Sequence, residues 1–377
     1  MKLKKLAMAG IGVALALSLA ACGGPTVDPP PAPPATGDAP TAAAGGLIGI
    51  SMPTTTLERW NNDGAHLKKL LEDAGYQTDL EFADNKTDVQ ISQLQNMINN
   101  GAKALVIAAI DGTVLGPVLQ TAADGGVKII AYDRLIMGTE NVDYYATFDN
   151  YMVGQYQGKF LEEQLGLASG KGPYNLEPFA GSPDDSNAGY FFGGAWDVLK
   201  PYFDSGQLVA QSGKAPATKA DWQAIGIQAW NTATAQAEME NRLNSFYTGG
   251  KKVDAVLSPN DSLALGIAQA LEGAGYQPGV DHPLLTGQDG DVANVKNILA
   301  GRQSMTVWKD TRNLGDQVAK MIDQIFSGAT VDVNDTETYN NDVKVVPSFL
   351  LPPKVITKAT VQEMIDAGFL TAAEVGL

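Results

Sequence analysis

The sequence predicts an α/β fold made of two doubly wound lobes. From Leu47 onwards, short apolar runs alternate with segments whose apolar residues recur at helical spacing. The runs 104–110 and 127–132 are apolar on both faces, as strands of a parallel sheet covered by helices are. The order of helix, strand and acidic strand end in residues 83–111 returns in residues 229–261. Two lobes of one design are the simplest interpretation.

The first 21 residues have the plan of a secretory signal. Three lysines precede an apolar run from Leu6 to Leu19, and small residues lead up to Cys22. The pattern is typical of a bacterial lipobox, in which Cys22 takes a lipid and becomes the mature N-terminus. A transmembrane helix is the alternative, but the run is shorter than the ~20 residues that a span needs. We therefore expect a lipoprotein signal peptide at 1–21. The mature chain would lie outside the cytoplasm, in the periplasm or on the outer face of the cytoplasmic membrane.

Residues 22–46 are rich in proline, alanine and glycine, which predicts an extended spacer with nothing to bury. Cys22 is the single cysteine, so the folded part has no disulfide and no thiolate metal site. The formal net charge of −16 becomes more negative once the three signal lysines are removed. Such a charge disfavours nucleic acid as a partner and suits a soluble monomer that touches a membrane only through its lipid.

The first lobe is predicted to alternate strands and helices from its first residues. A buried strand at 47–52 is followed by helical spacing that ends at Gly75, and a strand at 80–83 by helical spacing that ends at Gly101. The second lobe shows the same kind of alternation. The stretch 71–77 also returns as 271–277, each with a glycine suited to a left-handed helix end before a tyrosine.

Ligands of open α/β sheets bind beyond the carboxyl ends of the strands. Polar and aromatic residues follow the predicted strands at just those places, including Asp111, Asn231 and Asp261. The same positions hold Arg59, Trp60, Asp133, Arg134, Asp185, Asn187, Trp230, Asn260, Asp289 and Lys309.

This set favours a neutral sugar as the ligand. Carboxylates accept from sugar hydroxyls, Arg and Lys donate to them, and Asn does both. Indole rings can cover the apolar faces of a pyranose. A phosphate would need cations without the aspartates, whereas an amino acid stays possible. The alternative for each residue is a structural role: an aspartate capping a helix, Asp133 and Arg134 as a surface ion pair, or Trp60 in the core.

Several motifs together resemble the periplasmic sugar-binding proteins of ABC transporters, which have the type I fold. The most similar are the xylose-binding and multiple-sugar-binding (glucose/galactose) receptors. The resemblance covers nearly all of the chain from Leu47, on the motifs Met52–Thr54, Glu58–Trp60, Ala131–Ile136, Tyr145–Asn150, Gly181–Ala188, Leu257–Asp261, Gly287–Asp289 and Asn334–Thr336. Among the strand-end residues it selects ten, all except Asp111, Asn231 and Asp261, as those that bind the sugar. Trp230 would be the stacking aromatic, and Trp60 is only adjacent to a matching position.

The resemblance also implies two Rossmann-like lobes joined by a multi-strand hinge. Lobe one would be 47–150 with 311–342, and lobe two 151–309 with 346–377, with chain crossings near 150–154, 307–310 and 345–347. Galactose-binding relatives carry an acidic calcium loop, but residues 331–335 lack the EF-hand spacing and its glycine. We expect no metal and no cofactor.

An enzyme is the weaker class. His66 and His282 are the only histidines, and the chain has no thiol outside Cys22 and no glycine-rich phosphate loop. Paired carboxylates could hydrolyse glycosides, but here they are interleaved with Arg and Asn, which favours binding. We therefore expect a solute-binding lipoprotein that delivers an aldopyranose of the xylose, glucose or galactose type to ABC permease subunits. The alternative is a sugar sensor for a chemoreceptor or a sensor kinase.

Overall fold

The structure, a computed structural model, describes residues 45–377. The predicted signal peptide, Cys22 and almost all of the linker therefore lie outside the described residues. Within 45–377, no helix is both long and apolar enough to cross a membrane.

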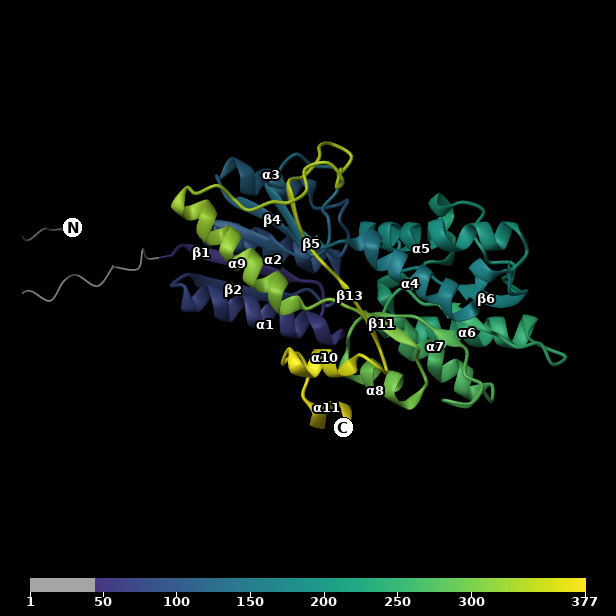
Figure 1. Cartoon of the computed structure of the whole chain (residues 1–377). Coiled ribbons are helices and arrows are strands. Elements are labelled where there is room, and N and C mark those ends of the chain that lie inside the picture. Colours follow the sequence, from purple (N-terminus) through teal and green to yellow (C-terminus); the bar gives the residue numbers. More distant parts are fainter. Residues whose placement is uncertain (1–44) are drawn as a thin grey trace, which may run out of the picture. The chain divides into compact units, whose positions relative to one another are not determined.

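The first lobe is built on a six-stranded sheet in which every neighbouring pair is parallel (Figure 1). Its strands, from one edge to the other, are β12 (Ser348–Leu351), β5 (Tyr144–Phe148), β4 (Lys128–Tyr132), β3 (Ala104–Ile107), β1 (Leu47–Met52) and β2 (Gln77–Phe82). The order 2-1-3-4-5 is that of a doubly wound sheet, whose direction of winding reverses between β1 and β3. This reversal opens a crevice at the carboxyl ends of the strands.

Helices cover both faces of this sheet because its strands are apolar on both faces. One hydrophobic cluster joins the sheet to α1 (Glu58–Asp73) and α9 (Thr311–Ser327). A second cluster joins it to α2 (Thr87–Asn99) and α3 (Gly116–Asp124). The predicted doubly wound lobe is confirmed.

The second lobe repeats this plan in a sheet of order β7-β6-β8-β9, followed by a smaller sheet of order β10-β11-β13. The strands are β6 (Tyr174–Pro178), β7 (Leu208–Val209), β8 (Ala255–Leu257), β9 (Leu284–Leu285), β10 (Gln288–Asp289), β11 (Met305–Trp308) and β13 (Lys354–Thr357). The helices are α4 (Asn150–Leu165), α5 (Ser186–Asp204), α6 (Thr232–Phe246), α7 (Asp261–Gly273), α8 (Val292–Ala300), α10 (Val361–Asp366) and α11 (Ala372–Val375). Short 3-10 turns lie at Leu167–Ser169, Lys219–Ile225 and Gln228–Trp230.

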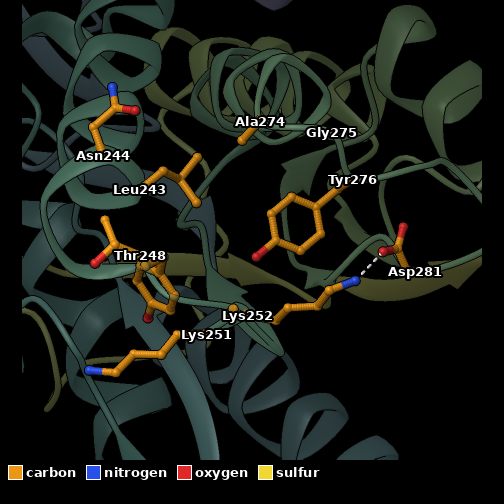
Figure 2. Close-up of a pocket in the computed structure, with 11 residues that line it drawn as sticks. Leu243, Asn244, Thr248, Lys251, Lys252, Ala274, Gly275, Tyr276 and Asp281 are labelled. Atoms are coloured by element: carbon orange, nitrogen blue, oxygen red, sulfur yellow. Dashed lines mark hydrogen bonds and ion pairs between the residues drawn. The ribbon is translucent and has the colours of Figure 1, made fainter.

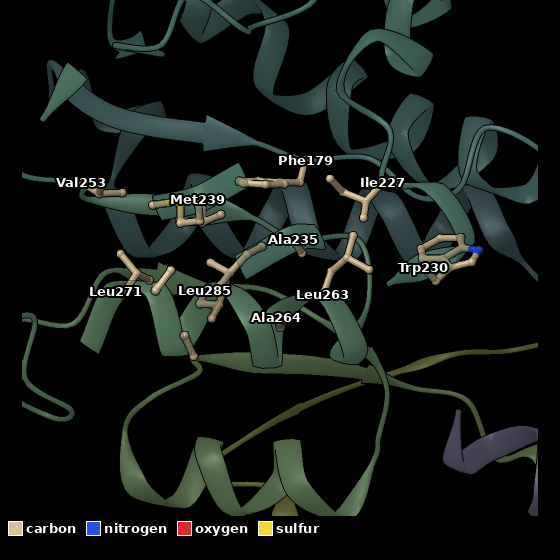
Figure 3. Packing of buried hydrophobic residues seen from close by; sticks show 14 of the residues in the cluster. Phe179, Ile227, Trp230, Ala235, Met239, Val253, Leu263, Ala264, Leu271 and Leu285 are labelled. Atoms are coloured by element: carbon tan, nitrogen blue, oxygen red, sulfur yellow. The ribbon is translucent and has the colours of Figure 1, made fainter. Parts of the chain in front are cut away.

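The core of the second lobe also has two faces. Side chains of α6 and α7, such as Met239 and Leu263, pack with Phe179, Val253 and Leu285 (Figure 3). On the other face, α4 and α5 pack through Leu161, Trp196 and Leu199. These two buried layers hold the strand ends of the lobe in fixed positions.

The chain passes between the lobes three times: from β5 into α4, from β11 into α9, and from β12 into β13 (Figure 1). The third crossing differs from the expected assignment of residues 346–377 to lobe two. Residues 348–351 pair with β5 in the sheet of lobe one, and the crossing falls at Pro352 and Pro353. Neither proline has an N–H to continue a ladder, which ends β12 there.

Candidate functional site

The ten residues predicted from sequence all line one pocket between the two lobes. Leu57, Phe191 and Gln288 complete its lining, and the space not filled by atoms is about 310 Å³. That space includes solvent at the mouth of the pocket; the cavity itself measures about 30 Å³, so the lining side chains nearly fill it in this form. The other strand-end residues, Asp111, Asn231 and Asp261, do not line it. Asp111 bonds the backbone N–H of Thr113, and Asn231 caps α6.

On the side of lobe one, the carboxyl ends of β1 and β4 position four of these side chains. Arg59 and Trp60 stand in the first turn of α1, after β1, and the Arg59 guanidinium lies 4.2 Å from the centroid of the Trp60 ring. Asp133 follows β4 with a left-handed backbone (φ 58°). Arg134, next in the chain, donates to the Ala109 carbonyl at 3.0 Å.

On the side of lobe two, Asp185 and Asn260 are the N-caps of α5 and α7, accepting from the backbone N–H of Asn187 and of Leu263. Both residues therefore have the structural role of capping a helix, and both also line the pocket. Trp230 ends a 3-10 turn at φ 52°, with its Nε1 donating to Asp185 Oδ2 at 3.2 Å. Its ring lies so near Gly181 that a Cβ there would be 2.0 Å from the indole, which explains the glycine.

Charged groups of opposite sign meet across the pocket. Arg59 reaches Asp63 at 2.9 Å and Asp133 at 3.0 Å within lobe one, and Asp289 of lobe two at 3.3 Å. A second pair across the lobes joins Arg134 Nε to Asp185 Oδ2 at 3.0 Å.

Lys309, at the crossing into α9, lies 2.9 Å from Asp289 and 3.8 Å from Asp133. Every one of these side chains is buried. Buried charges need partners, so the network is a preformed set of donors and acceptors.

The two sides of the pocket differ in how they tune their carboxylates. Burial pushes the pKa of Asp133 up, but the charges of Arg59, Lys309 and Arg134 outweigh burial and lower the pKa below its usual value. For Asp185, burial outweighs the charge of Arg134, and the pKa is raised. On acidification Asp185 is therefore protonated before Asp133.

Asn187 connects the lobes as well as facing the pocket. Its amide nitrogen donates to the carbonyl of Asp133 at 2.6 Å, and its amide oxygen lies 3.0 Å from the Tyr145 hydroxyl. Part of its capacity for hydrogen bonds is thus used within the protein.

Three buried polar atoms of the lining have no hydrogen-bond partner among the described residues: Arg59 Nε, Trp60 Nε1 and Gln288 Oε1. A buried polar group left unpaired costs about 1–3 kcal/mol, so a ligand or a water that bonds these atoms would be favoured. Within residues 45–377, no group of three or more His, Cys, Asp and Glu side chains is arranged to hold a metal ion.

Sequence reasoning missed Leu57, Phe191 and Gln288 as lining residues. Leu57 and Phe191 are apolar and cannot be told from core residues by pattern alone. Gln288 could have been predicted, because it directly precedes Asp289 at a strand end.

A second, wider hollow lies in lobe two between the ends of α6 and α7, lined by Leu243, Tyr247, Lys252, Tyr276 and Asp281 among others (Figure 2). Its space of about 950 Å³ includes the solvent at its mouth. It contains none of the predicted residues, and Lys252 is paired with Asp281. The smaller pocket between the lobes is the better candidate, because donors and acceptors converge on it from both sides.

Comparison with known proteins agrees with the two-lobed α/β fold described above. The sequence profile of the periplasmic binding protein domain family matches residues 48–330. The chain is 49% identical to the multiple sugar-binding periplasmic receptor ChvE of Rhizobium radiobacter, over 88% of the chain and 92% of the receptor. It is 35% identical to the D-xylose-binding periplasmic protein of Escherichia coli, over 87% and 92%. A crystal structure of an ABC transporter solute-binding protein from Clostridium phytofermentans with bound β-D-glucose is 49% identical, with a TM-score of 0.83 over 87% of this chain and 99% of that one.

Proposed function

The chain belongs to the periplasmic binding protein family, and we propose that it binds an aldopyranose of the xylose, glucose or galactose type between its lobes and delivers it to an ABC importer. Family membership makes it an extracytoplasmic binding protein and not an enzyme. The names of its relatives support a sugar as the ligand.

One observation carries the proposal: positively and negatively charged side chains, all able to form hydrogen bonds, converge on one small pocket from both lobes. Lobe one offers Arg59, Asp133 and Arg134, while lobe two offers Asp185, Asp289 and the neighbouring Lys309. The charges balance, so the pocket has no net field to attract an anion. Sugar hydroxyls, which donate and accept, can use both kinds of group.

The two indoles of the pocket support a ring-shaped ligand. Trp230 is held against Gly181 and edge-on to Phe191, with ring centroids 6.3 Å apart. Such a fixed flat surface suits the C–H face of a pyranose. Whether a C6 hydroxymethyl group is accepted depends on the pocket wall, to which Leu57 and Phe191 contribute.

Delivery to a permease is favoured over the alternative of a sensor for a chemoreceptor or a kinase. The support is the similarity to solute-binding proteins of ABC transporters. In either role, sugar would favour a closed form, because only that form contacts it from both lobes. The ten lining residues predicted from sequence are proposed as the contacts, and the protein is proposed to act as a monomer without cofactor or metal.

A thermal-shift panel tests the ligand class. Pentoses, hexoses, uronic acids and amino acids are each added to the purified mature protein. A ligand at a hundredfold over its dissociation constant adds about 2.7 kcal/mol of stability. We expect stabilisation by aldopyranoses. Stabilisation by amino acids alone would overturn the proposal, and stabilisation by xylose without glucose would show that the C6 group is excluded.

A lipid anchor at Cys22 is also proposed, on the sequence pattern alone, since Cys22 lies outside the described residues. Cys22→Ser is expected to release the protein from the membrane fraction while leaving sugar affinity unchanged. The spacer up to residue 46 separates the anchor from the folded lobes. A variant that still partitions with membranes would contradict the anchor.

A further inference from the structure

We propose that Asp261 is a positioning residue of the sugar site: it does not line the pocket, but it holds Asp289 in its binding orientation from behind. The inference rests on the proposed function, because it assigns a role in sugar binding. Asp261 is the first residue of α7, directly after the lining residue Asn260.

The carboxylate of Asp261 is fully buried and receives hydrogen bonds from four groups. Gln303 Nε2 donates to Oδ1 at 2.9 Å, and Thr306 Oγ1 donates to Oδ2 at 3.0 Å. The backbone N–H groups of Gly290 and Asp291 donate to Oδ2 at 2.9 and 3.0 Å. The nearby cations Arg59 and Lys309 pair with Asp289, whereas the groups that stabilise a charge on Asp261 are these neutral donors.

Two of the four donors are the backbone amides that directly follow Asp289. Asp289 has a φ of 104°, a conformation that a residue with a Cβ rarely adopts. Strained backbone of this kind persists only where its surroundings fix it. Bonds from Asp261 to the next two N–H groups fix the peptide on the C-terminal side of that strain.

The packing around the carboxylate is equally close. A Cβ on Gly287 would lie 2.2 Å from Asp261 Oδ1, so the segment before Asp289 can approach this near only as glycine. Thr306 stands in β11, which pairs with β10 and leads to Lys309. Asp261 therefore ties α7, the segment carrying Asp289, and the strand that delivers Lys309.

The test is a double-mutant cycle of Asp261→Asn and Asp289→Asn, read as affinity for D-glucose and D-xylose by calorimetry at pH 8. Burial first, and the charge of Asp289 second, raise the pKa of Asp261 to about 7, so that the carboxylate is ionised at this pH. In Asp261→Asn, an NH2 group replaces one of the two carboxylate oxygens. In either orientation it faces N–H or O–H groups that donate to that oxygen in the wild type. We expect Asp261→Asn to weaken sugar binding about tenfold, since a hydrogen bond to a charged group is lost. In the Asp289→Asn background it should have little further effect.

Glu177→Gln is the matched control. Glu177 is also a fully buried carboxylate of lobe two, bonded by Ser212, Arg242 and Tyr247, none of which lines the pocket. It should lower the melting temperature but leave sugar affinity unchanged. Thr306→Val removes only one donor to Asp261. It serves if Asp261→Asn does not fold, with an expected loss of about threefold that also vanishes in the Asp289→Asn background.

The outcomes separate this inference from the proposed function. If the wild-type protein binds none of the sugars, the function itself fails and Asp261 loses its role with it. If the wild type binds, an unchanged affinity in both Asp261→Asn and Thr306→Val would overturn the positioning role alone. The positioning role would also be overturned if Asp261→Asn lowered the sugar affinity by the same factor in the wild type and in the Asp289→Asn variant. Equal factors would show an effect that does not act through Asp289.

Discussion

Asp133 and Asp289 end corresponding strands of the two lobes, yet the protein supports them in different ways. Asp133 follows β4 of lobe one. Asp289 ends β10, which comes next in the chain after β9, and β9 takes the place of β4 in lobe two. Both have left-handed backbones, at φ 58° and 104°, and Arg59 contacts both carboxylates.

Neutral groups hold the backbone at Asp133. Its carbonyl oxygen accepts from the Tyr145 hydroxyl at 2.7 Å, the Thr147 hydroxyl at 2.8 Å and the Asn187 amide at 2.6 Å. At Asp289 the corresponding support is the buried carboxylate of Asp261. It accepts hydrogen bonds from the backbone N–H groups of the next two residues, Gly290 and Asp291. One lobe thus fixes a carbonyl with donors, and the other fixes amides with an acceptor that carries charge.

The difference teaches that similar sheets do not require similar supports. A support made of hydroxyls and an amide keeps its state over the whole pH range of a folded protein. A support made of a buried carboxylate depends on a proton. The backbone support of Asp289 should therefore respond to pH more than the backbone support of Asp133.

The largest effect is expected from removing either aspartate. Asp133→Ala and Asp289→Ala should each weaken sugar binding about ten- to a hundredfold, because loss of a buried charged partner costs ~1.5–3 kcal/mol. Calorimetry with the sugar that stabilises the wild type most measures this. The control is Asp111→Ala, at the end of another strand but outside the pocket, whose affinity should be unchanged. A wild-type affinity in either pocket variant would remove that residue from the site.

A smaller effect is expected from the support in lobe one. Tyr145→Phe leaves the Asp133 carbonyl with two donors and removes a contact to Asn187 across the lobes. We expect about a threefold loss of affinity, in line with one neutral hydrogen bond. The free variant should also be less compact than the free wild type in solution scattering, while saturating sugar restores compaction. Equal radii and equal affinities would contradict this role of Tyr145.

The sequence was sufficient for the fold class, and it placed most strand-end residues at one pocket because strand ends meet at one edge of a parallel sheet. The family resemblance separated the ten lining residues from Asp111, Asn231 and Asp261, which lie outside the pocket. The two sequence echoes differ in meaning. The echo of 83–111 in 229–261 marks the corresponding strands β3 and β8. The echo of 71–77 in 271–277 falls after α1 and α7, which are not corresponding helices. It reflects a shared helix ending, since Gly75 and Gly275 have φ of 91° and 97°.

The supports of the site could not be predicted. Tyr145 looks like an ordinary strand residue, and its role arises from a bond to Asn187 more than forty residues away in the chain. Asp261 stood among the strand-end residues, but no pattern shows that it bonds residues 290, 291, 303 and 306 behind the pocket. Such contacts depend on how segments distant in sequence are packed.

The smallest predicted effect is a pH dependence of stability carried by Asp261. Burial and the charge of Asp289 raise its pKa from 3.8 to about 7 in the folded protein. Between these values the folded state binds a proton that the unfolded state does not. The contribution of Asp261 is therefore fully present below about pH 4 and is lost as the pH rises through 7. The pKa of neighbouring Asp291, raised by burial and by Asp261, acts in the same direction.

Asp261→Asn isolates this contribution, because other groups such as Asp133, with its lowered pKa, act in the opposite direction in both proteins. Free energies of unfolding from urea titrations at pH 5 and pH 7.5, without sugar, measure it. Whatever the sign of the total change in the wild type, the variant should lose less stability, or gain more, as the pH rises. Tyr145→Phe, which alters the support in lobe one, should keep the wild-type dependence on pH. If Asp261→Asn also kept it, the buried carboxylate would not titrate in this range, and the two supports would not differ in their response to protons.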